Sequence, residues 1–403
     1  AYIAKFDDFF HDENYVLRKK IILKVSDYRS ATVQGKYLAR RGLWVSEYRI
    51  ESGLNCGGHA FASAGHLLGP ILEEFKQKKP ELIEELHAIY TKALVAIGRP
   101  QNKTSHDVRI TVQGGISTAS ENEFLLKYFE VDSTGWGTPF LLVPKVTNVD
   151  EVHLEKLSAA EDRDVFLSDS SPMGIPFWNL RSSASEEARC QRIEDGKPGS
   201  RCRKGYLMSS TEFTKMPICH ASRAYQRLKL IRLPEENLSA KKLSLARGNV
   251  LVKSCICNDL AGCATMKYGI DEEAKPAICC GPNIVNFSKI ATLEEMVSHI
   301  YGRISLLTRS DGPHMFIRDL SLYVDYLRRE IEKVSLDLST RTPKYFREFK
   351  ENLLSGIEYY RGLADKFVEE KQKRFLDDLR ELSEAVERIS PVPAVEVCPE
   401  IGL

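Results

Sequence analysis

Residues 107–144 read DVRITVQGGISTASENEFLLKYFEVDSTGWGTPFLLVP and carry the clearest fold pattern in the chain. The stretch opens with alternating β-branched residues, which is the pattern of a strand. After Gly114-Gly115 comes a helical pattern, and then a second strand that runs into Gly137-Thr138. The stretch therefore predicts a βαβ unit with a glycine site at the end of each strand.

Such a unit is suited to holding a phosphate group. Glycines let backbone amides approach phosphate oxygens, and a helix N-terminus adds unpaired N–H groups and the positive end of the helix dipole. A single glycine pair is more often only a turn. Two glycine sites at successive strand ends favour a phosphate site, which we assign to Gly114, Gly115, Gly137 and Thr138.

The preceding part of the chain repeats the strand–helix–strand pattern. Residues 20–27 and 42–51 predict strands, and residues 29–41 between them predict a helix, so the two strands are expected to be parallel. The second strand leads into SGLNCGGH at residues 52–59, a glycine-rich loop at the carboxyl end of a strand, where parallel α/β folds bind ligands. Residues 60–98 predict a long helical segment, as one helix or two.

The composition is that of a soluble globular protein. The 403 residues are enough for two or three domains, and 43% hydrophobic and 28% charged residues are ordinary values. A net charge of +1 gives no global basic field for nucleic acid or an anionic membrane. No apolar run approaches the roughly 20 residues of a membrane span. Ten cysteines without a signal peptide favour a reducing, cytoplasmic location.

Three motifs resemble the ordered signatures of the nitronate monooxygenase (2-nitropropane dioxygenase) family, which includes flavin-dependent enoyl reductases. They are Asn55-Cys56-Gly57-Gly58-His59, Gly114-Gly115-Ile116 and Gly137-Thr138-Pro139-Phe140-Leu141. That family shows Ala-Gly-Gly-His after the sixth strand of a (β/α)8 barrel, Gly-Gly-Ile after the seventh and Gly-Thr-x-Phe-Leu after the eighth. The resemblance covers residues 20–145.

The resemblance implies an FMN-dependent oxidoreductase acting on a small molecule. The FMN phosphate would lie on the amides of Gly114, Gly115, Gly137 and Thr138, with Gly57 and Gly58 passing close to the flavin. His59 would then act as the base or hydrogen-bond donor beside the flavin ring. Two further residues have open alternatives: Cys56 contacts substrate or flavin, or is a packed thiol, and Lys24 points into the site, or is a solvated strand-end charge.

The chain departs from the family pattern in two ways. Asn55 and Cys56 replace the usual acidic residue and alanine. Moreover, only about 20 residues precede the first recognisable strand, which would be the fifth of the barrel, whereas a whole barrel needs roughly 200–250 residues. The sequence therefore predicts an α/β fold in which residues 1–180 supply strands five to eight of an FMN-type barrel. Strands one to four then come from a missing or separate N-terminal half, which we favour, or the later segments of the chain complete an unusual barrel.

A weaker likeness concerns the FMN domain of glutamate synthases, which has a similar pair of glycine motifs followed by a cysteine-rich loop. Ser171-Pro172-Met173-Gly174-Ile175 resembles the Cys-Pro-Val-Gly-Ile of that loop. Because serine stands at the position of the cysteine ligand, this loop is not expected to bind iron as that family does.

Residues 181–310 are predicted to form a cysteine-rich extension that starts with a polar linker. Paired Cys-x2-Cys knuckles are absent, which argues against zinc, whereas iron–sulfur clusters need no compact motif. The predicted ligands of a [4Fe–4S] cluster, an electron relay for the flavin, are Cys202, Cys219, Cys257 and Cys280. The alternative is a set of buried free thiols.

Residues 311–403 show apolar residues at helical spacing with mixed charges between them, which predicts a helical arm and a tail. A packing role or homo-oligomerisation is the expected function of the arm. Two alternatives to a flavoenzyme remain open. In the first, the chain is a non-catalytic assembly subunit that keeps a barrel scaffold. In the second, it is a barrel that binds another phosphorylated ligand.

Overall fold

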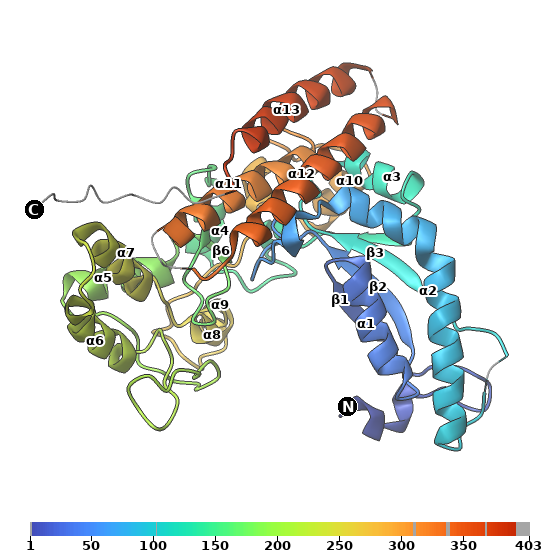
Figure 1. Ribbon diagram of the computed structural model, residues 1–403, viewed down its shortest axis with the longest axis horizontal. Helices are drawn as coiled ribbons and strands as arrows, with labels where there is room; N and C mark the ends of the chain where they lie inside the picture. Colours follow the sequence, from blue (N-terminus) through green and yellow to red (C-terminus); the bar gives the residue numbers. More distant parts are fainter. Residues whose placement is uncertain (1, 102, 309–311, 336–338, 367–368, 392–403) are drawn as a thin grey trace, which may run out of the picture.

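The computed structural model describes residues 2–101, 103–308, 312–335, 339–366 and 369–391 (Figure 1). Residues 392–403 of the predicted arm and tail lie outside this part. The described chain contains one four-stranded sheet and one two-stranded sheet. Their strands are β1 (Ile21–Val25), β2 (Val45–Glu51), β3 (Arg109–Gln113), β4 (Ser133–Gly135), β5 (Val165–Ser168) and β6 (Phe177–Leu180).

The four-stranded sheet is parallel and has the order β1-β2-β3-β4, so both predicted βαβ units are present. The register pairs Glu51 with Gln113 and Gln113 with Gly135. The last residues of three neighbouring strands therefore lie side by side. The loops that follow them leave the sheet at the same edge.

The prediction of a (β/α)8-type barrel is wrong. The described residues form six strands, and β5 and β6 pair antiparallel with each other instead of extending the parallel sheet. Helices accompany the sheet: α1 (Tyr28–Ala39) and α2 (Leu68–Ala96) pack against each other beside β1 and β2. The segment predicted as one helix or two is the single helix α2, which continues through Pro80 after a short 3-10 turn.

The predicted C-terminal arm consists of α11 (Met315–Ser335), α12 (Pro343–Leu363) and α13 (Glu369–Glu387). Figure 1 shows these helices together at one end of the parallel sheet. Asp319 of α11 accepts hydrogen bonds from Ser52 Oγ at 2.6 Å and from the Leu68 N–H at 3.2 Å. Because Ser52 directly follows β2, α11 is anchored to the edge where the strands end.

The cysteine-rich region lies on the other side of the molecule, around the helices from α5 (Ala184–Glu194) to α9 (Gly262–Lys267) (Figure 1). The predicted polar linker contains a regular helix, α5, whose first turn carries two glutamates and whose last turn carries an arginine, as the helix dipole favours. The helices from here to the arm are α4 (Glu151–Ser158), α5 (Ala184–Glu194), α6 (Arg223–Arg232), α7 (Ala240–Leu251), α8 (Ile256–Asp259), α9 (Gly262–Lys267) and α10 (Leu293–Ile300). In the described part of the chain, no helix has the length and apolar character needed to cross a membrane.

Candidate functional site

A cavity of about 340 Å³ lies at the carboxyl ends of β2, β3 and β4. Its walls come from the loops that follow these three strands and from a distant segment that includes Cys279 and Asn283. The strand-end loops contribute the predicted residues Cys56, Gly57, Gly114, Gly115, Gly137 and Thr138. The structure thus brings six of the nine predicted catalytic and cofactor-binding residues to one cavity.

The backbone of the cavity offers free hydrogen-bond donors. Within the described residues, no acceptor is found for the N–H groups of Gly114, Gly115, Gly137 and Thr138, all of which line the cavity. Gly115 is buried, Gly114 and Thr138 are half-buried and Gly137 is exposed, so a ligand that enters the cavity can reach these donors. A ligand with several acceptor oxygens suits these donors, and phosphate is such a ligand.

The glycine pair after β3 is required by its surroundings. Gly114 and Gly115 have φ of +108° and +76°, which an L side chain rarely adopts. A Cβ on Gly115 would come within 2.0 Å of the Asn55 Nδ2. Asn55 is completely buried and donates from Nδ2 to the Met315 carbonyl at 3.2 Å, so it cannot move aside without losing this bond.

The start of the following helix, α3 (Ala119–Lys127), is capped by side chains of the protein itself. The Glu121 carboxylate accepts hydrogen bonds from the N–H groups of Ser117 at 2.9 Å and Thr118 at 3.0 Å. Thr118 in turn accepts from the Glu121 N–H, completing a capping box. None of residues 117–121 lines the cavity, so the expectation that this helix end supplies amides to the phosphate gains no support from the structure.

A segment far along the chain closes the cavity. The Gly281 N–H donates to Thr138 Oγ1 at 3.1 Å, and a Cβ on Gly281 would lie 2.3 Å from that oxygen and 3.3 Å from the Gly57 nitrogen. Asn283 donates from Nδ2 to the Ile116 carbonyl at 3.0 Å. Residues 279–283 are thus fitted between the loops of all three strands.

Two thiols and one ion pair set the electrostatics of the cavity. Burial raises the pKa of Cys56 to about 12 and that of Cys279 to about 11, so both are neutral thiols at pH 7. The Lys24 ammonium lowers both values to a smaller extent. Lys24 itself forms an ion pair with Glu51, which lines the cavity. Lys24 is therefore a neighbour of the cavity and not part of its lining.

His59 and Gly58 lie beside the cavity, outside its lining. His59 Nε2 is 2.7 Å from Ser171 Oγ, and His59 forms an antiparallel bridge with Phe177 of β6. Burial, followed by the Lys24 charge, lowers the pKa of His59, so the imidazole is neutral at pH 7. Gly58 has φ of +83° and donates its N–H to the Cys279 sulfur.

The four predicted cluster ligands do not lie together. The thiols of Cys219 and Cys257 interact electrostatically with Cys202, as does the thiol of Cys255, which was not among the predicted ligands. Cys280 is instead completely buried in the main hydrophobic core, next to Cys279. Of the two adjacent cysteines only Cys279 lines the cavity. The glycine that follows the pair, Gly281, is the local signal of this close approach, because a Cβ there would meet Thr138.

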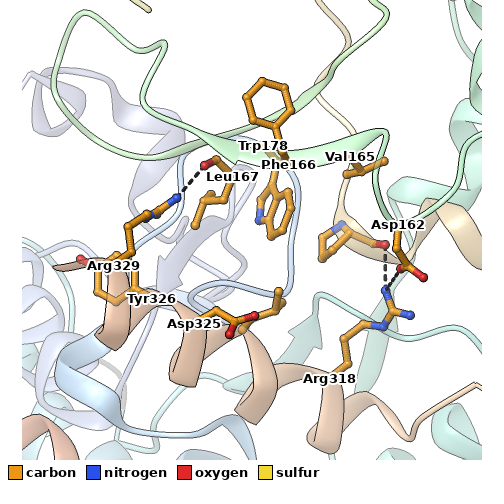
Figure 2. A pocket seen from close by; sticks show the side chains of 11 residues that line it. Asp162, Val165, Phe166, Leu167, Trp178, Arg318, Asp325, Tyr326 and Arg329 are labelled. Carbon is orange, nitrogen blue, oxygen red and sulfur yellow. Dashed lines mark hydrogen bonds and ion pairs between the residues drawn. The ribbon is translucent and has the colours of Figure 1, made fainter. Parts of the chain in front are cut away.

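A second cavity, of about 370 Å³, lies between α11 and the β5–β6 hairpin. Figure 2 shows Arg318 and Arg329 of α11 on opposite sides of it, with Trp178 between them. Arg329 donates to the Leu167 carbonyl at 2.7 Å, and Arg318 donates to the Pro282 carbonyl at 3.0 Å. Both guanidinium groups therefore connect α11 to the backbone of other segments. No sequence motif indicated this cavity.

A third group consists of Asp150, His153 and Cys263, whose candidate ligand atoms lie within 4.8 Å of one another. His153 Nδ1 lies 2.7 Å from the Asp150 carboxylate, and His153 Nε2 accepts from the Ala184 N–H at 3.1 Å. Both ring nitrogens are thus engaged within the protein. This arrangement ties the start of α5 to α4 and leaves no nitrogen lone pair for a metal.

Comparison of the chain with protein-family models, with curated proteins and with solved structures finds no match. The resemblance to nitronate monooxygenases accordingly stays a prediction.

Proposed function

We propose that this chain is an FMN-dependent oxidoreductase whose cofactor lies in the glycine-lined cavity. The observation that carries the proposal is the set of unpaired N–H groups at Gly114, Gly115, Gly137 and Thr138, which converge from two neighbouring strand ends. They are the positions that the family resemblance assigns to the FMN phosphate. Ligands of parallel α/β sheets bind at this edge.

The other walls of the cavity suit an isoalloxazine ring. Trp136 and Ile116 supply apolar surface, and Gln113 and Glu51 supply polar groups at one side. A volume of about 340 Å³ falls in the range of roughly 300–1,000 Å³ that small-molecule sites occupy. Among the residues that the structure describes, no lysine or arginine lines the cavity. The phosphate would therefore be held by backbone dipoles, and its binding should depend only weakly on salt.

Bound FMN would supply the capacity to accept or donate a hydride or an electron pair. The chain's own residues supply proton transfer. His59 is a neutral imidazole close to the glycine loop and is positioned by Ser171, so it is the group we assign to proton handling. Cys56 and Cys279 remain protonated at neutral pH and act as wall residues.

The test is flavin retention. Purified full-length protein is incubated with FMN, separated from free flavin by gel filtration and examined by absorption. We expect oxidised-flavin bands near about 370 and about 450 nm that bleach on reduction. Gly137→Val is the matched variant, because a Cβ at this position meets no protein atom within 4 Å and would only obstruct the ligand. Wild-type protein that retains no flavin would contradict the proposal.

A further inference from the structure

Three separate segments of the cysteine-rich region meet around Ser200. The Ser200 N–H donates to the Ala221 carbonyl at 2.9 Å, and the Arg223 N–H donates to the Ser200 carbonyl at 3.0 Å. These bonds hold Cys202 beside the segment that carries Cys219, and the two cysteines line one cavity. A neighbouring cavity, which shares Ser200 and Arg223, is lined by Cys255.

The fourth cysteine of this group is Cys257, in the first turn of α8. Its thiol and that of Cys255 are hydrogen-bonded, and both interact electrostatically with Cys202. Cys219 interacts with Cys202 and Cys257. Cys202 is thus the common neighbour of the three other thiols, although they are 17 or more residues away in the sequence.

The surroundings of the four cysteines differ from those of an ordinary packed thiol. None of the four belongs to the main hydrophobic core, whereas Cys280 does. The helices that follow Cys219 and precede Cys255 in the chain, α6 and α7, bury few apolar residues. Small regions without a sufficient core are commonly held together by a metal centre, whose binding free energy becomes folding free energy.

The spacing of the thiols favours a cluster over a single ion. Asp150, His153 and Cys263 are the only three candidate ligand atoms within 4.8 Å of one another in the described part of the chain. The four thiols are therefore more widely spread than one zinc ion requires, since Zn–S bonds of roughly 2.3 Å bring four sulfurs close together. In a [4Fe–4S] cluster each thiolate binds a different iron, so the sulfurs lie farther apart.

Basic residues provide the charge that such a cluster needs. Arg201 and Arg203 flank Cys202 in the sequence, and both line the cavity with Cys255, together with Arg192 and Arg223. The Arg192 Nε is buried and has no hydrogen-bond partner among the described residues. Arg203 is ion-paired with Asp271, and Asp259 and Glu273 line the same cavity. Arg192, Arg201 and Arg223 are therefore the guanidinium groups that offset the net negative charge of four thiolates and an iron–sulfide core.

We propose that Cys202, Cys219, Cys255 and Cys257 bind a [4Fe–4S] cluster that holds the three segments together. The cluster site is independent of the glycine-lined cavity, and its test does not depend on flavin binding. On binding, each thiol loses its proton to solvent and its thiolate coordinates one iron.

The experiment compares full-length variants purified without oxygen and supplied with iron and sulfide. We expect about four iron atoms and about four sulfide ions per chain in the wild type. Cys202→Ser and Cys255→Ser should each lose most of the iron and lower the melting temperature. Cys190→Ser is the control, because Cys190 is exposed on α5, and it should keep full iron content.

Three results would overturn the proposal. They are zinc in place of iron, no bound metal in the wild type, and full iron retention in the Cys255→Ser variant. Cys280→Ala tests the alternative ligand set. If that variant folds, as judged by circular dichroism, it should retain the iron, and loss of iron from a folded Cys280→Ala protein would contradict the assignment of Cys255.

Discussion

Asp319 is a carboxyl group placed where charge is costly. It is 1% exposed, and burial raises its pKa from 3.8 to about 6 against the smaller opposing effect of hydrogen bonds from Ser52 and Leu68. The folded state therefore holds the Asp319 proton more tightly than the unfolded chain does. Its contribution to stability is most favourable below about pH 4 and is lost as pH rises through about 6.

The Asp319→Asn variant tests this linkage. An amide stays neutral, so the free energy of unfolding of the variant should rise relative to wild type by about 3 kcal/mol between pH 4 and pH 7, from a shift of about two units. Urea unfolding at several pH values measures this difference. Parallel pH profiles for the two proteins would show that Asp319 titrates normally in the folded state.

Gly115 tests the packing of the strand-end turn. Gly115→Ala introduces a Cβ at a positive φ and against Asn55, so we expect a loss of about 2–4 kcal/mol in the free energy of unfolding. Gly98→Ala is the matched control, with φ of +71° and open space around the added Cβ, and it should lose only about 1 kcal/mol. Equal losses in chemical denaturation would contradict the role of Asn55.

At the residue scale, the glycine pair after β3 could be predicted because the positive φ of Gly114 and Gly115 favours glycine, whereas Gly137 has an ordinary helical backbone. Gly114, Gly115 and Gly137 line the cavity as the sequence suggested. The contributions of Cys279 and Glu121 could not be predicted, because each depends on a contact with a segment far away in the chain. Cys279 approaches Gly58, and Glu121 accepts a hydrogen bond from the Met315 N–H at 2.7 Å.

At the element scale, α3 connects the parallel sheet to the C-terminal helices through hydrogen bonds. Glu121, in its first turn, accepts from the N–H groups of Ser117 and Thr118 before the helix and of Met315 at the start of α11. Glu121 is 5% exposed, so water cannot replace it. One carboxylate thus fixes the turn after β3 and the entry into α11.

Glu121→Ala should lower the free energy of unfolding by about 3 kcal/mol or more, because three N–H groups lose their acceptor. Glu123→Ala, on the exposed side of the same helix, removes the surface ion pair with Lys127. This variant should change the free energy of unfolding by less than about 0.5 kcal/mol. Thermal and urea unfolding of both variants provide the comparison. If the Glu123→Ala protein were as unstable as the Glu121→Ala protein, the loss of stability would come from helix propensity and not from the buried carboxylate.

Most elements before residue 145 and after residue 312 follow from local patterns. Alternating β-branched residues mark β3, and Asp27 and Thr118 cap α1 and α3. The helix α5 was missed because its residues are almost all polar, and only its charge distribution along the helix dipole indicates it. Periodicity thus predicts elements that bury an apolar face and overlooks those that bury little.

At the scale of the whole molecule, the barrel prediction failed because strand patterns do not specify what covers the edge of a sheet. The four parallel strands have the consecutive order expected of part of a barrel. In this chain β5 and β6 pair with each other instead of extending the parallel sheet. The helix α11 lies beside the ends of the parallel strands, where Asp319 accepts a hydrogen bond from Ser52. Those contacts join residues more than 250 positions apart.

The closing segment 279–283 makes a prediction for the intact protein. This segment is hydrogen-bonded to Thr138 and Ile116. Ligand binding should therefore slow amide hydrogen exchange in the segment and in the strand-end loops together. Hydrogen–deuterium exchange with and without FMN should show slower exchange at residues 113–118, 135–139 and 279–283. Exchange around Ser200 serves as the internal control and should not change. Protection confined to the second cavity, between α11 and β5–β6, would place the ligand elsewhere.

The most direct test of the account compares FMN with riboflavin by calorimetric titration of the full-length protein. If the free amides at the two glycine sites hold a phosphate, FMN should bind at least about tenfold more tightly, which corresponds to about 1.4 kcal/mol. Gly137→Val should weaken FMN binding while leaving the melting temperature of the ligand-free protein unchanged. Equal affinities for FMN and riboflavin, or no binding of either, would contradict the central claim.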